Sequence, residues 1–160
     1  MLIKDLIDED FTNYKKPCMY IAASKCNWKC CIEQGLDISI CQNSQIARQN
    51  DFSVTIPELY DRYINNPITE SILFSGLEPM LQFEDVLETV KYFRNNGCND
   101  DFVIYTGYYK EEIYDKVEEL SKYKNIVIKF GRYKPDSEKH KDEILGVELI
   151  SNNQYAERIS

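Results

Sequence analysis

Short apolar runs alternate along this chain with longer segments in which apolar residues recur at helical spacing. The runs cover residues 18–23, 72–74, 102–106 and 125–130. Runs of this length, bounded mostly by Gly, Pro, Asn or Asp, are typical of buried strands. We therefore expect four strands in the interior of the protein.

The segments between these runs carry helix signals. One begins at Thr55, which can cap a helix together with a Glu three residues later, and it ends at Asn65. Two more apolar stripes of helical period cover about 83–95, where Gly97 provides a stop, and about 110–122. Each helix lies between two of the predicted strands.

Strands that alternate with such helices predict right-handed βαβ units around a mostly parallel sheet, so the expected fold class is α/β. Ligands of these sheets bind beyond the carboxyl ends of the strands. The segments that follow the four runs are a cysteine-rich loop, residues 76–79, Thr106-Gly107 and Gly131. We expect them to share one edge of the sheet.

Length and composition favour one domain over residues 1–160, with a core of about 18–133 and a tail, 134–160, that wraps or extends. No run of about eighteen apolar residues is present, and charged residues interrupt the opening segment, so neither a membrane span nor a secretory signal is expected. The sequence predicts a cytoplasmic protein. Its formal charge of -8 disfavours nucleic acid as a ligand and favours a protein or small molecule.

Four of the six cysteines lie close together, at positions 26, 30, 31 and 41. Cytosolic reductants make such a cluster more typical of a metal or catalytic site than of a disulfide. Three thiolates on a [4Fe–4S] cluster leave one iron open for a ligand, whereas four thiolates would close it. The same side chains could instead bind a tetrahedral zinc ion.

The Cys26-Asn27-Trp28-Lys29-Cys30 start and the turn at Ser75-Gly76-Leu77-Glu78-Pro79 resemble motifs of the radical S-adenosylmethionine (SAM) family. Within it, the chain is most similar to the activating enzymes of anaerobic (class III) ribonucleotide reductase. The resemblance runs from about residue 18 to the end of the chain, including Ser151-Asn152-Asn153-Gln154 near the C-terminus. It implies a partial (βα) barrel with the cluster loop after the first strand.

The chain departs from the family pattern at its third cysteine, because Glu33 stands where that ligand is expected. Cys41-Gln42-Asn43 reproduces the end of the motif, so we interpret the intervening residues as an insertion that loops out. A loop this short adds only about 1–2 kcal/mol of closure entropy. The resemblance then implies Cys26, Cys30 and Cys41 as cluster ligands, with Cys31 as the rival ligand. Cys18 and Cys98 are interpreted as ordinary cysteines.

The resemblance also implies which residues contact SAM. Glu78 would accept from the methionine ammonium group, and the glycine would let the backbone approach the ligand. Leu77 replaces a family glycine, and the turn could equally be a simple strand-to-helix connection. The implied cofactor contacts are Ile40, Asn43, Ser75, Gly76, Leu77, Glu78, Pro79, Thr106 and Asn153.

The activity implied is reductive cleavage of SAM to methionine and a 5′-deoxyadenosyl radical, which generates a glycyl radical on the large subunit of an anaerobic ribonucleotide reductase. An electron donor such as flavodoxin or ferredoxin is implied as well. The short chain leaves little to cover the sheet edge, which favours a protein substrate. The alternatives are another glycyl radical enzyme or a small nucleoside precursor as substrate, and a non-catalytic zinc-stabilised binding module.

Overall fold

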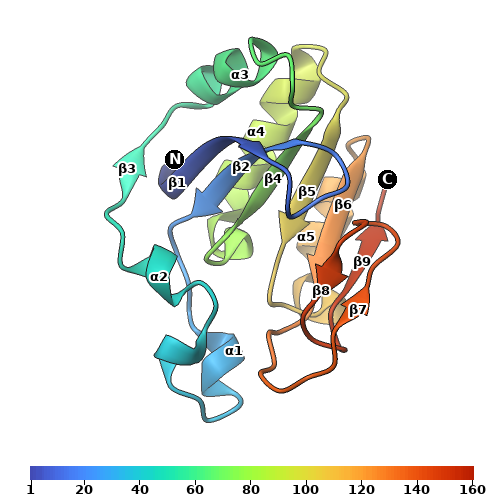
Figure 1. The fold of residues 1–160 in the computed structure, drawn as a ribbon. Coiled ribbons are helices and arrows are strands. Elements are labelled where there is room, and N and C mark those ends of the chain that lie inside the picture. Colours follow the sequence, from blue (N-terminus) through green and yellow to red (C-terminus); the bar gives the residue numbers. More distant parts are fainter.

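A twisted seven-stranded sheet forms the centre of the computed structural model, which describes all 160 residues (Figure 1). The strand order is β3-β1-β2-β4-β5-β6-β9, and a separate hairpin pairs β7 with β8. The strands are β1 (Leu2–Asp10), β2 (Cys18–Ala23), β3 (Phe52–Ser53), β4 (Ser71–Gly76), β5 (Asp101–Tyr105), β6 (Ile126–Phe130), β7 (His140–Lys141), β8 (Glu148–Leu149) and β9 (Tyr155–Arg158).

The four inner strands β2, β4, β5 and β6 are parallel, as predicted from the apolar runs. The outer strands β1, β3 and β9 are antiparallel to their neighbours. The predicted α/β class with a mostly parallel sheet is confirmed. The N-terminal strand β1 was not predicted, because its apolar residues are separated by acidic ones and carry only a weak alternation.

Helices connect the parallel strands in the expected positions. They are α3 (Ile56–Ile64), α4 (Phe83–Asn95) and α5 (Tyr114–Ser121), and the last two are preceded by the 3₁₀ turns η2 (Pro79–Gln82) and η3 (Lys110–Ile113). Thr55 and Glu58 form the predicted capping box, in which the Glu58 Oε2 accepts from the Thr55 amide at 2.7 Å. Two short helices and one 3₁₀ turn follow β2: α1 (Lys29–Ile32), η1 (Ile38–Ile40) and α2 (Ser44–Ala47).

The two faces of the sheet are covered differently. Alternate strand residues such as Ile72 and Phe74 pack under the helices in the larger apolar core. Their neighbours, such as Leu73 and Val103, face the opposite side and pack with Leu145 of the tail. Thus the helices cover one face, and the tail together with the loop after β1 covers the other (Figure 1).

The tail lies back against the sheet, and β9 adds an antiparallel edge strand to β6. Its segment around residues 147–150 reaches the edge formed by the carboxyl ends of the parallel strands. That edge is consequently less open than the chain length led us to expect. No helix has the length and apolar character needed to cross a membrane.

Candidate functional site

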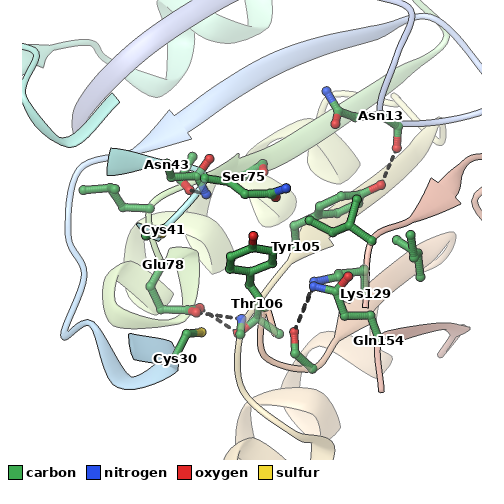
Figure 2. A pocket seen from close by; sticks show the side chains of 18 of the residues that line it. Asn13, Cys30, Cys41, Asn43, Ser75, Glu78, Tyr105, Thr106, Lys129 and Gln154 are labelled. Carbon is green, nitrogen blue, oxygen red and sulfur yellow. Dashed lines mark hydrogen bonds between the residues drawn. The ribbon is translucent and has the colours of Figure 1, made fainter. Parts of the chain in front are cut away.

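A cavity of about 260 Å³ lies beyond the carboxyl ends of β2, β4, β5 and β6. The segments that follow these four strands all contribute to its wall, so the predicted shared edge is present. The cysteine loop and the glycine turn form one side (Figure 2). The loop after β1 and the tail form the other side, through Thr12, Asn13 and residues 147–150.

All four clustered cysteines line this cavity: Cys26, Cys30, Cys31 and Cys41. The Cys26 thiol accepts a hydrogen bond from the Trp28 amide at 3.2 Å. Trp28 has a left-handed backbone, with φ of 58°, which turns the chain into α1. The ligand assignment stays a prediction, but the chain does bring these thiols to one cavity.

The segment between Cys31 and Cys41 loops out, in the manner of the proposed insertion. Gly35, with φ of 64°, reverses the chain after α1, and η1 then leads back to Cys41. Burial raises the pKa of the Cys31 thiol, and the neighbouring Cys41 acts in the same direction. Cys41 therefore returns to the cavity that Cys26 and Cys30 line, although ten residues separate it from Cys30 in the sequence.

The thiols suit an iron–sulfur cluster by chemistry, but they are not assembled around a metal position. No three His, Cys, Asp or Glu side chains lie close enough together to hold a metal ion in this arrangement. Burial raises the pKa of Cys26 to about 11 and also raises the pKa of Cys30. Thiolates are the ligands of such clusters, so loading would release protons and draw the sulfurs together.

Cys18 and Cys98 do not line the cavity, in keeping with their interpretation as ordinary cysteines. Cys18 is buried in β2, where its thiol lies 3.2 Å from the Ser71 hydroxyl. Cys98 follows α4 and contacts Asp100 at 3.8 Å. Both thiols lie near the amino ends of parallel strands, at the edge of the sheet opposite the cavity.

The glycine turn after β4 is fixed against the end of β2 and against the cysteine loop that follows it. Gly76 has φ of 76°, and a Cβ at this position would lie 2.7 Å from Ala22. The Gly76 carbonyl accepts a hydrogen bond from the Asn43 side chain, and the Glu78 amide donates to the Lys25 carbonyl at 2.7 Å. These bonds join the glycine turn to both ends of the cysteine loop.

Leu77 does not have a positive φ, so its backbone does not require the glycine that the family has at this place. Leu77 lines the cavity together with Ser75, Gly76 and Asn43. Its amide approaches the Ala23 carbonyl at 3.3 Å. The substitution is thus compatible with the turn.

Glu78 is buried, with an exposed fraction of 6 %, and its carboxylate already accepts three hydrogen bonds. The donors are the Met80 amide at 3.0 Å, the Thr106 hydroxyl at 2.7 Å and the Gly107 amide at 2.8 Å. Burial raises the pKa of this carboxyl, although the three hydrogen bonds act to lower it. A carboxylate offers about four acceptor positions, so one remains for a ligand.

Three of the predicted contacts do not reach the cavity. Ile40 is 45 % exposed, Pro79 is buried in η2, and neither lines the cavity wall. The Asn153 side chain donates instead to the Tyr109 hydroxyl and the Arg132 carbonyl, both at 3.0 Å. Thr106 does line the cavity, but its hydroxyl donates to Glu78.

Sequence reasoning missed several residues that shape the site, among them Gln82, Arg132 and Lys129. The side-chain Oε1 of Gln82 accepts from the amides of Ser24 and Lys25, at 2.6 and 3.2 Å, and so fixes the start of the cysteine loop to η2. Arg132 contacts the cysteine loop from the segment after β6. Lys129 is a buried lysine in the cavity wall. Only Lys129 gave a signal, as the one charged residue in its apolar run.

A family model described as a 4Fe-4S single cluster domain matches residues 17–155 of the chain. Domains of this type are typical of radical SAM activating enzymes. No match was found among the curated proteins or the solved structures. Because the family model covers most of the chain, including every cysteine that lines the cavity, the protein belongs to the family of 4Fe-4S single cluster domains of the radical SAM type.

Proposed function

We propose that the protein is an activating enzyme that cleaves SAM reductively to methionine and a 5′-deoxyadenosyl radical. The radical would abstract hydrogen from a glycine of a partner, the large subunit of an anaerobic ribonucleotide reductase or another glycyl radical enzyme. A flavodoxin or ferredoxin would supply the electron. The observation that carries the proposal is that the cysteine loop and the glycine turn meet at one cavity.

In this proposal Cys26, Cys30 and Cys41 hold the cluster, and Cys31 lies beside them as the rival ligand. Bound there, a [4Fe–4S] cluster with one open iron would supply the electron that cleaves the sulfonium of SAM. Cys26 and Cys30 are partly buried, which limits the access of water to their sulfurs. Exclusion of water also strengthens the electrostatic interactions of the site.

The glycine turn would orient the methionine end of SAM. The remaining acceptor position of Glu78 is available to an ammonium group, and the hydrogen bonds from Met80, Thr106 and Gly107 hold the carboxylate in place. Gly107 has a second role, because a Cβ there would lie 2.7 Å from the Cys30 sulfur. A larger residue at this position would displace that ligand.

The cavity is partly covered, which favours a second candidate function: the enzyme would act on a small nucleoside precursor instead of a protein. Thr12, Asn13 and residues 147–150 wall the side of the cavity opposite the cysteines. A glycine loop of a partner protein would have to enter between these segments and α1. A small molecule needs no such opening.

Anaerobic reconstitution with iron and sulfide tests the proposal. We expect a brown protein that absorbs broadly near about 400 nm and binds about four irons. Incubation with dithionite and SAM should then yield 5′-deoxyadenosine, and addition of the partner reductase should yield a glycyl radical visible by electron paramagnetic resonance. A colourless protein with about one zinc would indicate the binding module instead.

A further inference from the structure

The cavity contains a buried ammonium group that has no carboxylate partner. Lys129 lies in β6 with an exposed fraction of 7 %, and its side chain projects from the face of the sheet that the tail covers. Its Nζ donates to one acceptor only, the Gly131 carbonyl at 3.1 Å. None of the ion pairs of the protein includes it, although an ammonium group has three protons to donate.

Burial of an unpaired cation is unfavourable, and the surroundings of Lys129 offset this only in part. The ring of Tyr105, its register partner on β5, lies 5.7 Å from Nζ. Burial lowers the pKa of Lys129 to about 8, although Glu78 and Cys30 act to raise it. An anion beside Nζ would stabilise the charged form and remove this penalty.

Gln154 lies next to Lys129, and the oxygen of its side-chain amide has no hydrogen-bond partner (Figure 2). It is buried, with an exposed fraction of 5 %, and it lines the same cavity. Its Nε2 lies 3.5 Å from the Gly131 carbonyl that Lys129 also contacts, and its Oε1 has no hydrogen-bond partner. A buried amide oxygen without a partner is unfavourable. Because Gln154 lines the cavity, its Oε1 is available to accept a hydrogen bond from a ligand there.

We propose that Lys129 and Gln154 form an anion subsite of the cavity. The subsite takes a carboxylate or phosphate group that has an N–H or O–H donor beside it. Lys129 binds the anionic oxygen and the Gln154 Oε1 accepts from the neighbouring donor. The anion could belong to the methionine end of SAM or to a separate substrate, so this inference deepens the proposed function and shares its site.

The test compares SAM with decarboxylated SAM, which lacks the carboxylate but keeps the sulfonium and the amine. Their dissociation constants are measured anaerobically on the reconstituted wild type and on Lys129→Met, whose unbranched side chain is one atom shorter and carries no charge. Lys110→Met is the matched control, because Lys110 pairs with Glu157 and does not line the cavity. Gln154→Leu provides a second variant for the neighbouring acceptor.

If the anion is that of SAM, the wild type binds SAM at least about tenfold more tightly than the decarboxylated form, and Lys129→Met binds both alike. The Lys110→Met control keeps the preference of the wild type. In the wild-type background, Gln154→Leu weakens the binding of SAM. In the Lys129→Met background, the same substitution leaves the binding of SAM unchanged. This result assigns the subsite to the SAM carboxylate.

If the anion belongs to a separate substrate, loss of the SAM carboxylate has little effect on the wild type. Inorganic phosphate, at about 10 mM, then raises the melting temperature of the SAM-bound wild type more than that of SAM-bound Lys129→Met. Potassium chloride is the control for a general effect of salt. The subsite would be overturned if the wild type and Lys129→Met show the same preference for SAM over decarboxylated SAM and the same stabilisation by phosphate.

Failure of the proposed function gives a different result. A wild type that does not bind SAM at all contradicts the proposed function. The comparison of phosphate stabilisation between the wild type and Lys129→Met can still be made on that protein, and it decides whether the subsite exists.

Discussion

Arg132 and Glu33 form an ion pair that joins the segment after β6 to the cysteine loop. The Arg132 Nη2 lies 3.0 Å from the Glu33 Oε1, and the Nε contacts the other carboxylate oxygen. The same guanidinium group binds both oxygens of Glu112 at 2.7 Å and the Gly107 carbonyl at 3.1 Å. Glu33 occupies the position of the expected third cysteine, yet it does not line the cavity. The ion pair instead holds α1 against the strand ends.

Loss of this ion pair should loosen the cysteine loop. Arg132→Met leaves the partly exposed carboxylates of Glu33 and Glu112 without their main partner, so we expect a decrease of about 1–3 kcal/mol in the free energy of unfolding. Urea unfolding of the apoprotein measures this free energy. We also expect the iron content of Arg132→Met after reconstitution to fall. The control is Lys139→Met, which removes an exposed ion pair with Glu148 and should change the free energy of unfolding and the iron content only a little. Equal effects of the two substitutions would contradict a special role for Arg132.

Single alanine substitutions distinguish the cluster ligands. We expect Cys26→Ala, Cys30→Ala and Cys41→Ala to lose the absorption near about 400 nm and most of the iron, because each removes one thiolate of the three. Cys31→Ala should keep both. Cys98→Ala, outside the cavity, is the control for the general effect of losing a thiol. If Cys31→Ala loses its iron while Cys41→Ala retains it, the insertion hypothesis is wrong.

Gly76→Ala tests the close approach of the glycine turn to β2. A new Cβ would lie 2.7 Å from Ala22, and φ of 76° is unfavourable for alanine. We expect the free energy of unfolding to fall by about 2–4 kcal/mol. The matched control is Gly97→Ala, where φ is 86° but no atom lies within 4 Å, so that only the backbone cost of about 1 kcal/mol applies. Similar losses in the two variants would show that the contact with Ala22 can relax.

Asp101 should make the protein more stable above pH 4 than below it. Burial acts to raise the pKa of Asp101, but hydrogen bonds from Arg158, Lys16 and Tyr14 outweigh burial and hold the pKa at about 2. A carboxyl whose pKa is lower in the folded than in the unfolded state, where it is about 4, contributes stability that is complete above about pH 5. This contribution, of about 1–2 kcal/mol, is lost as the pH falls through about 4 towards 2.

The measurement is urea unfolding of the wild type and Asp101→Asn between about pH 7 and pH 2.5. The difference in unfolding free energy between the two proteins should be largest at neutral pH and should shrink at acidic pH. Other carboxylates titrate in both proteins and cancel in the comparison. A difference that stays constant down to about pH 2.5 would show that the ion pairs of Asp101 do not lower its pKa.

The sequence predicted the parallel core because apolar runs and helical stripes are local signals. Residues such as Thr55, whose cap is formed within one turn, can be placed from their neighbours alone. By contrast, β1 is defined by its antiparallel pairing with β2 across the loop of residues 11–17, and its acidic, weakly alternating sequence does not reveal this pairing.

The candidate site shows the same division. Glycine and cysteine motifs placed Gly76, Glu78 and the clustered cysteines at one edge, since parallel strands bring their carboxyl ends together. The roles of Arg132 and Gln154 depend on contacts with residues far away in the sequence. For this reason the sequence interpretation named Asn153, which faces Tyr109, and missed its neighbour Gln154 in the cavity wall.

Quantification of 5′-deoxyadenosine is the most direct test of the central claim that thiolates from positions 26, 30 and 41 hold a cluster that reduces SAM. The reconstituted protein is incubated anaerobically with dithionite and SAM, beside Cys41→Ala as the negative control. We predict 5′-deoxyadenosine and methionine in equal amounts from the wild type, and neither from the variant. An iron-loaded wild type that produces no 5′-deoxyadenosine, or a Cys41→Ala variant that produces as much as the wild type, would contradict the account.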